Sequence, residues 1–321
     1  MKYLFTLLTL ILCGVTATAQ QSTQYSMYML NQFAQNPAYA GMDNSLSVTG
    51  VFRKQWVDLP GSPTYQNANA HLPLYAASGG IGINFENDAI GAEASTLVTL
   101  AYNYQLNIGR VGILSVGVAG GMFQKELNGA ILRTPEGNYE GVLVDHRDDI
   151  LPNTLETGQS PVFEAGVFFQ GERLEIGLSA KNLVEPTVNL SENLDLQLVR
   201  TYFATIGYRI DVGDALALRP SVMVRTDAIQ TQMDFSLLAY INENIFVGGS
   251  YRGYSVTTTD AVAIIAGLKI SEQLNFAYAY DLTLSSLNSV SNGTHEIMLN
   301  YNFGKPIGQG KLPPIIYNPR F

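Results

Sequence analysis

Two stretches near the C-terminal end of the chain alternate apolar and polar side chains over a length that can cross a membrane. In residues 273–284, every second side chain from Leu274 to Leu282 is apolar, and those between them are small or polar. Residues 293–304 repeat this pattern. A period of two is typical of a strand with one apolar face, and an oblique bilayer crossing takes about 9 to 11 residues, against about five or six in a soluble sheet. The pattern therefore predicts a hairpin of a transmembrane β-barrel.

The composition agrees with a barrel and not with a helical membrane protein. Charged residues make up 14% of the 321 residues, well below the roughly 25% of a soluble chain. Glycine (30) and tyrosine (18) are plentiful. Outside the first twenty residues, no run approaches the roughly 18 apolar residues of a membrane helix.

The first nineteen residues are typical of a secretory signal peptide. Lys2 precedes an apolar core, and small residues at 17–19 predict cleavage after Ala19, with Gln20 as the new N-terminus. The one cysteine, Cys13, lies within this segment, and Leu12 before it disfavours a lipoprotein signal. The mature chain would then have no cysteine, which excludes disulfides, thiol chemistry and cysteine-bound metals.

The charge balance excludes one class of partner. Loss of Lys2 with the signal reduces the 18 basic residues to 17, against 27 acidic residues, a net charge of −10. A phosphate backbone requires a basic surface, so nucleic acid is not expected as a partner.

The alternating pattern recurs along the chain and predicts fourteen strands. They are residues 45–56, 64–71, 79–86, 94–106, 111–124, 161–170, 173–182, 199–211, 214–226, 230–241, 244–254, 260–270, 273–283 and 293–304.

The connections between these strands differ on the two sides. All even-numbered connections are short, and the longest odd-numbered ones are 125–160, 183–198 and 284–292. Short turns on one side and long loops on the other are typical of outer-membrane barrels. We therefore expect an all-β antiparallel barrel of about 14 strands over residues 45–304, with the last strand paired to the first. Its polar inner face would carry charges that we interpret as structural lining: Arg53, Glu164, Lys181, Arg209, Arg219, Arg225, Asp234, Arg252, Asp281 and Glu296.

Two terminal segments lie outside the predicted strands. Residues 20–44, the N-terminal segment, are too apolar to remain in water, so we expect them to be a plug in the barrel or to pack on a periplasmic partner; both interpretations stay open. Residues 305–321 are basic and proline-rich, which predicts an extended periplasmic tail.

The sequence predicts neither a catalytic site nor a metal or cofactor site. The three histidines, His71, His146 and His295, are far apart in this topology, and we expect them to be isolated surface or rim residues. Residues 145–149 are acidic and could hold calcium, but they lack the glycine turn and the spacing of a calcium loop, so a solvated acidic loop is favoured. The glycines at 79–82 and 116–121 precede no helix, so they do not indicate a nucleotide site.

Three motifs stand out within residues 20–75. They are Tyr25-Ser26-Met27-Tyr28-Met29-Leu30-Asn31, Asn36-Pro37-Ala38-Tyr39-Ala40-Gly41 and Phe52-Arg53-Lys54-Gln55-Trp56. Together they resemble the PorP/SprF family of type IX secretion membrane proteins. The resemblance implies an outer-membrane barrel of Bacteroidota. It also implies a role in type IX secretion or gliding, or in the export and surface attachment of large adhesins.

Our first hypothesis is a non-enzymatic outer-membrane component of this machinery. Its partners would be outer-membrane lipid, other secretion components and a secreted or surface adhesin. The alternative is a channel for hydrophobic or small polar solutes, similar to fatty-acid barrel transporters. The candidate plug or partner-binding residues are Tyr25, Met29, Asn31, Asn36, Pro37, Tyr39, Gly41, Arg53, Gln55, Trp56, Lys311 and Arg320.

Overall fold

A computed structural model describes residues 24–304, with gaps at 141–143, 149, 192–193, 228, 256–257 and 285. The predicted signal peptide and the basic tail, with Lys311 and Arg320, lie outside the described residues. In this part of the chain, no helix is long and apolar enough to cross a membrane.

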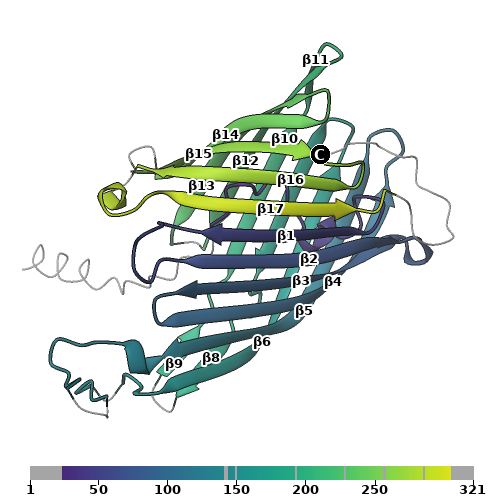
Figure 1. Cartoon of the computed structure of the whole chain (residues 1–321). Coiled ribbons are helices and arrows are strands. Elements are labelled where there is room, and N and C mark those ends of the chain that lie inside the picture. Colours follow the sequence, from purple (N-terminus) through teal and green to yellow (C-terminus); the bar gives the residue numbers. More distant parts are fainter. Residues whose placement is uncertain are drawn as a thin grey trace, which may run out of the picture.

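The chain folds into an antiparallel β-barrel (Figure 1). Its strands are β1 (Ser47–Lys54), β2 (Thr64–Leu74), β3 (Gly79–Ile90), β4 (Glu93–Asn107), β5 (Ile113–Asn128), β6 (Leu155–Gln170), β7 (Leu174–Lys181), β10 (Thr201–Tyr208), β11 (Ile210–Val212), β12 (Leu216–Thr226), β13 (Thr231–Ile241), β14 (Ile245–Ser255), β15 (Thr258–Lys269), β16 (Leu274–Thr283) and β17 (Thr294–Asn302). A separate hairpin is formed by β8 (Thr187–Ser191) and β9 (Leu194–Gln197). The short 3-10 helices are η1 (Pro37–Tyr39), η2 (Tyr75–Ala77), η3 (Gly129–Ile131) and η4 (Ser286–Ser289).

The sheet closes on itself with the predicted number of strands. β10 and β11 follow one another along the same neighbour, β12, and together form one strand of the wall. The fifteen strands of the sheet therefore make a wall of fourteen. The first and last strands pair along their length, from Ser47 opposite Asn302 to Lys54 opposite His295. Closure pairs the two terminal strands of the sheet with each other, which suits a membrane barrel because lipid offers no hydrogen bonds to a free edge.

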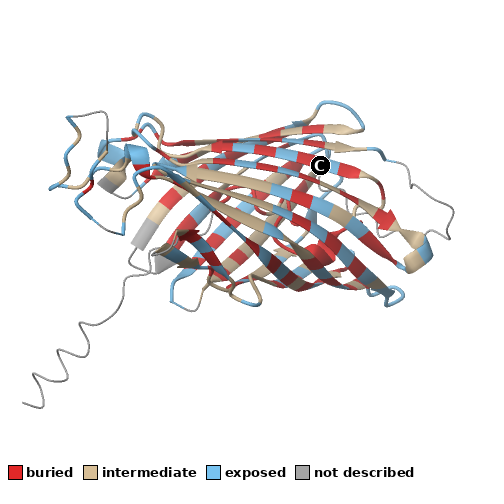
Figure 2. Cartoon of the chain, turned by 90° about the horizontal axis from the view of Figure 1, so that it is seen from below, coloured by how far each residue is buried: buried red, intermediate tan, exposed pale blue. Residues whose placement is uncertain are grey.

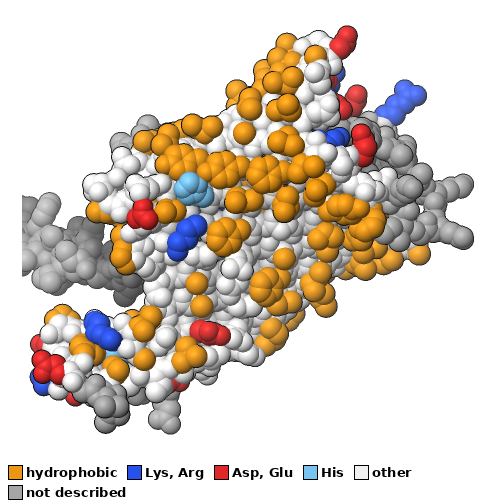
Figure 3. Space-filling view, viewed as in Figure 1, with side chains coloured by type: hydrophobic (Ala, Val, Ile, Leu, Met, Phe, Trp, Pro, Cys, Tyr) orange, Lys and Arg blue, Asp and Glu red, His pale blue; other side chains and the backbone are white. Residues whose placement is uncertain are grey.

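Side chains alternate between the outer and inner faces of the wall. In β13, Met233, Phe235 and Leu237 are exposed, whereas Asp234 and Ser236 between them are buried. Figure 2 shows this alternation of buried and exposed residues along the strands, and Figure 3 shows hydrophobic side chains spread over the outer face of the barrel. Such an apolar outer face fits the hydrocarbon core of a bilayer.

The glycines of β5 do not interrupt the strand, which runs for 16 residues. Gly117 and Gly121 share the inward face of this strand, where side chains would collide with Ala38 and with the backbone of β4. The alternation is weak in this part of the sequence because these positions must be empty for the interior to pack.

The two ends of the barrel differ as predicted. The strand ends at the right of Figure 1 are joined by short turns, such as 171–173 and 242–244, and the longest loop, 129–154, projects at the opposite end. By the usual orientation of outer-membrane barrels, the loops face outward and the turns face the periplasm. We call these the loop-side and turn-side ends.

Candidate functional site

The described part of the N-terminal segment, residues 24–44, lies inside the barrel. Ser26, Tyr28 and Ala38 are at most 1% exposed, and the purple trace runs behind the wall in Figure 1. Its two ends lie at different depths. Gln24 contacts Gln55 and Arg252 near the loop-side ends of β1 and β14, whereas Asn44 accepts a hydrogen bond from Tyr75 in a periplasmic turn. The segment therefore extends through the lumen from the loop side to the turn side.

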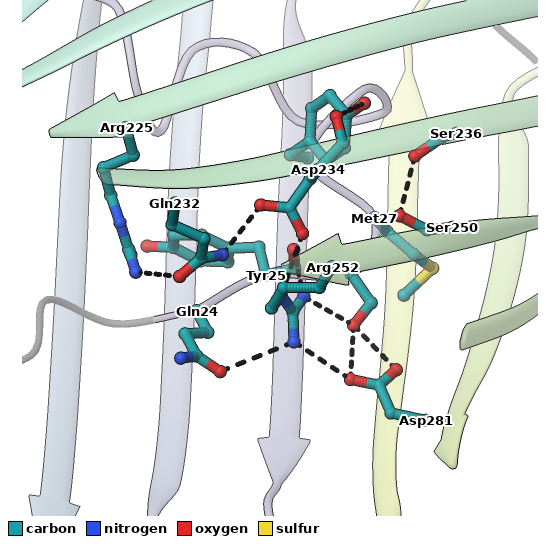
Figure 4. A network of polar contacts seen from close by, with 12 residues as sticks. Gln24, Tyr25, Met27, Arg225, Gln232, Asp234, Ser236, Ser250, Arg252 and Asp281 are labelled. Carbon is teal, nitrogen blue, oxygen red and sulfur yellow. Dashed lines mark hydrogen bonds and ion pairs between the residues drawn. The ribbon is translucent and has the colours of Figure 1, made fainter. Parts of the chain in front are cut away.

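Five charged side chains near the loop-side end form one buried group, the ionic cluster. Arg53 lies 2.8 Å from both Asp281 and Glu296, while Arg252 lies 2.8 Å from Asp234 and 3.3 Å from Asp281. None of the five side chains is more than 4% exposed. Figure 4 shows Arg252 between Asp234 and Asp281, facing Gln24. Buried charges are stable only when they are paired and hydrogen-bonded.

The strand register brings the ionic cluster together. Arg53 of β1 is the direct partner of Glu296 in β17, and Asp234 of β13 is the direct partner of Arg252 in β14. Asp281 of β16 accepts hydrogen bonds from both arginines and joins the two pairs. Cross-strand opposite charges on an inward face are the sequence signal for this cluster, but they become visible only once the register is known.

The N-terminal segment completes the hydrogen bonding of the ionic cluster. The amides of Ser26 and Met27 donate to Glu296 at 2.9 and 3.1 Å, and the Ser26 hydroxyl donates to Asp281 at 2.7 Å. Arg252 in turn donates to the carbonyl of Tyr25 at 2.9 Å. Three carboxylates face two guanidinium groups, so these donors compensate the acidic excess. Our interpretation of these charges as lining only is therefore incomplete, because they bind the segment.

The middle of the N-terminal segment packs on apolar side chains of the wall. Met27 and Leu30 belong to a buried cluster with Leu238, Ile265 and Met298. Burying such a side chain contributes about 1.5–3 kcal/mol. The inner face is consequently less polar than the alternation predicted, since the segment covers its apolar positions.

The turn-side part of the segment lies against three glycines of the wall, which we call the glycine groove. The groove is formed by Gly80 of β3, Gly117 of β5 and Gly166 of β6, where a Cβ would collide with Ala40, Ala38 and Asn36. This close approach places η1 directly on the sheet. Glycine is the residue that permits backbone to approach backbone so closely.

Polar wall side chains beside the glycine groove bind the backbone of the segment. Asn103 donates to the carbonyls of Ala38 and Ala40 at 2.6 and 2.7 Å. Ser115 donates to the same Ala38 carbonyl at 2.6 Å, and Ser179 donates to that of Gln35 at 2.7 Å. In the opposite direction, the Asn36 side chain donates to the carbonyl of Val167 at 3.0 Å. These bonds satisfy an otherwise buried irregular backbone.

His71 is a binding residue of the lumen, so its placement as an isolated rim residue is wrong. It is 3% exposed, its Nδ1 accepts from the amide of Gly41 at 3.1 Å, and its Nε2 lies 3.5 Å from Asp43. The ring packs against Phe33 and Tyr39. The Nδ1 contact requires an unprotonated nitrogen at that position.

His146 is also buried, and it holds the long outer loop together. Its Nε2 lies 3.0 Å from the carbonyls of Gly129 and Pro152, and its Nδ1 lies 3.0 Å from the Tyr139 hydroxyl. Only His295 lies on the outer face, where its Nδ1 is 2.6 Å from the Tyr278 hydroxyl. The three histidines thus occupy three separate environments.

The remaining candidate residues lie in or near the lumen. Met29 packs against buried apolar clusters, and Asn31 exchanges hydrogen bonds with Asn67 and Asn69 of β2 at 2.9 Å. Trp56 is half-buried in the loop after β1, and its amide donates to Thr294 at 3.2 Å. Tyr25 meets Tyr65 edge-on, and Tyr39 meets Phe168 in the same way.

The hairpin β8–β9 was not predicted and also occupies the lumen. Val188 and Leu198 pack with Val162 of the inward face of β6, and a side chain at Gly158 would collide with the hairpin backbone. Nearby, Lys181 of β7 lies 2.8 Å from Glu86 of β3, across four neighbouring strand pairs. The connection pattern places residues 183–198 in a loop on the loop side, although their short alternation of apolar and polar residues at 188–191 and 194–197 is a strand signal.

A small pocket with a cavity volume of about 40 Å³ lies at the turn-side end of the lumen. Met29 and Gln32 of the segment line it together with Arg219, Leu238 and Tyr240 of the wall. Gly207 also lines it, and a Cβ at this position would make only ordinary contact with Glu175 and Ser221. Within the described ranges, no group of three or more His, Cys, Asp or Glu residues could hold a metal ion.

Known structures similar to this chain are outer-membrane barrels. Omp33 of Acinetobacter baumannii has 8% identity over 81% of this chain and 98% of its own, with a TM-score of 0.45. The toluene transporter TbuX of Ralstonia pickettii has 12% identity over 83% and 91%, with a TM-score of 0.45. The monoaromatic hydrocarbon channel CymD has 12% identity over 88% and 95%, with a TM-score of 0.49. At this similarity the substrates of these proteins say nothing about this chain.

No curated protein sequence matches the chain. A family match does exist, and it covers residues 17–301 with the description type IX secretion system membrane protein PorP/SprF. It includes the whole barrel wall except the last residue of β17 and all of the described N-terminal segment. The chain therefore belongs to the PorP/SprF family of type IX secretion membrane proteins and is an outer-membrane β-barrel.

Proposed function

We propose that this barrel is a non-enzymatic component of the type IX secretion and gliding machinery that supports the export or surface attachment of secreted proteins such as large adhesins. The observation that carries the proposal is the family membership together with a lumen occupied from end to end by the N-terminal segment. A lumen filled in this way suits a scaffold better than a pore. The separate environments of the three histidines support a role without catalysis.

Co-purification tests the proposed partners. The native barrel would be extracted in mild detergent and the co-purifying proteins identified by mass spectrometry. We expect periplasmic or outer-membrane secretion components and a secreted surface protein. Recovery of the barrel alone, from cells in which secretion is active, would contradict the proposal.

The basic tail is the proposed contact with periplasmic components. A variant without residues 305–321 would be compared with the full chain in the same co-purification. We expect periplasmic partners to be lost while the barrel still folds. If partner capture is unchanged, the tail has no docking role.

A channel for hydrophobic or small polar solutes is the second candidate, and the pocket at the turn-side end favours it. Single-channel recording in planar bilayers separates the two functions. A steady open conductance would contradict the scaffold. A silent barrel would contradict the open channel.

A further inference from the structure

The wall of the lumen binds many main-chain groups of the N-terminal segment. Wall side chains contact the carbonyls of Tyr25, Gln35, Ala38 and Ala40, and the amides of Ser26, Met27 and Gly41. Every peptide presents these groups, and the side chains of Ser26, Tyr28, Asn31 and Asn36 add hydrogen bonds that depend on the sequence of the segment.

The wall is complete without the segment. All fourteen strands pair with one another, and residues 24–44 contribute only η1 and no strand to the sheet. The segment is thus bound inside a closed barrel in the manner of a ligand. The glycine groove and the ionic cluster are the two sites of the wall whose side chains are suited to binding it.

From these contacts we infer that the lumen is a peptide-binding site and that the N-terminal segment is its resident, exchangeable ligand. The site takes a nearly uncharged peptide that is folded into successive turns. Small residues must face the glycine groove, and two successive amides must reach Glu296. Residues 24–44 fit this description because Asp43 is their one charged residue. The inference goes beyond the proposed secretion role and does not depend on it.

Two features define how such a peptide is held. The acidic excess of the ionic cluster requires hydrogen-bond donors, and peptide amides supply them without adding a charge. At the other end, Ala38 and Ala40 are fully buried against the glycine groove, which leaves no room for larger side chains. A peptide with large residues at these two positions would not fit.

The test uses a barrel in which the link to the segment can be cut. A protease recognition sequence is inserted between Asn44 and Ser45, at the turn-side end, and the purified protein is cleaved in detergent. A fluorescent synthetic peptide of residues 24–44 is then added, and its binding is followed by anisotropy. Mass spectrometry measures how much of the original segment is released.

We expect the labelled peptide to bind saturably and to be displaced by unlabelled peptide of the same sequence. A peptide of the same composition in scrambled order should bind at least tenfold more weakly. Methylation of the Ser26 and Met27 amides in the peptide should also weaken binding about tenfold, because it removes both donors to Glu296.

Wall variants provide a second readout that does not change the peptide. Ser115→Ala and Ser179→Ala each remove one donor to a segment carbonyl, and we expect about a fivefold loss of peptide affinity for each. Ser160→Ala, at a buried serine of β6 beside the β8–β9 hairpin, is the matched control and should bind normally. A cleaved segment that never exchanges before the barrel unfolds would overturn the inference. Equal binding of native and scrambled peptides would do the same.

Discussion

The two ends of the N-terminal segment are held by different physical means. At the loop-side end, the ionic cluster surrounds Ser26 and Met27 with buried charges. At the turn-side end, the glycine groove brings backbone against backbone, and neutral Asn and Ser side chains supply the hydrogen bonds. A charged contact is costly when one partner is missing, whereas a close contact is costly when an atom is added. We therefore expect that removing a charged side chain destabilises the loop-side end, and that adding side-chain atoms destabilises the turn-side end.

The largest effect is expected in the ionic cluster. Arg53→Met should lower the free energy of unfolding by about 3–5 kcal/mol, because Asp281 and Glu296 would lose a shared buried counter-charge. Urea titration of the purified barrel measures this loss. The double variant Arg53→Met, Glu296→Gln should recover much of the stability, since it also removes one unpaired carboxylate. A loss below about 1 kcal/mol for the single variant would show that the cluster is solvated.

The glycine groove should respond to added atoms. Gly117→Val places a side chain against the backbone of Pro37 and Ala38, and we expect a loss of about 2–3 kcal/mol together with release of η1 from the wall. Gly120→Val is the matched control on the outward face of the same strand, where a Cβ makes only ordinary contact with Phe163. Limited proteolysis of the segment should increase in the first variant alone. Equal sensitivity of both variants would mean that the effect comes from the strand and not from the groove.

His71 and His295 test the same contrast between the lumen and the lipid-facing surface. His71→Ala leaves the buried amide of Gly41 without its acceptor, so a loss of about 1–2 kcal/mol is expected. His295→Ala removes one contact with Tyr278 on the outer face and should change stability by less than about 1 kcal/mol. Thermal unfolding measures both. Secretion should continue in cells with either variant if the protein is not an enzyme, and its abolition with normal folding would contradict that proposal.

The smallest effect is expected at the periplasmic rim. Arg209 pairs with Asp211 at 2.6 Å and Glu243 at 2.9 Å, but both carboxylates are exposed. Arg209→Ala should therefore cost less than about 1 kcal/mol, and the difference should shrink further in high salt. Comparison with Arg53→Met tests whether burial, and not the number of ion pairs, decides the effect. A similar loss for both would refute that explanation.

The alternating pattern determined the wall of this protein. The hairpin of residues 273–284 and 293–304 has the length, the two faces and the turn parity of a barrel, and β16 and β17 occupy these positions. The closing pair of β1 and β17 followed from the even strand count. The sequence reveals these properties because successive side chains of each strand face lipid and lumen in turn, with a period of two residues. The apolar character of residues 25–33 likewise indicated burial, and the segment motifs indicated the family.

Only the tertiary structure decided how the interior is assembled. Arg53, Arg252 and Asp281 lie on separate strands, and their meeting depends on register and on the curvature of the closed wall. The direction of the N-terminal segment, the inward fold of β8–β9 and the function of Gly117 as a groove also depend on contacts between distant residues. Periodicity reports which face a residue occupies, but not which residues from other strands share that space. The sequence alone therefore determined the barrel wall, and the tertiary structure determined which residues fill its lumen.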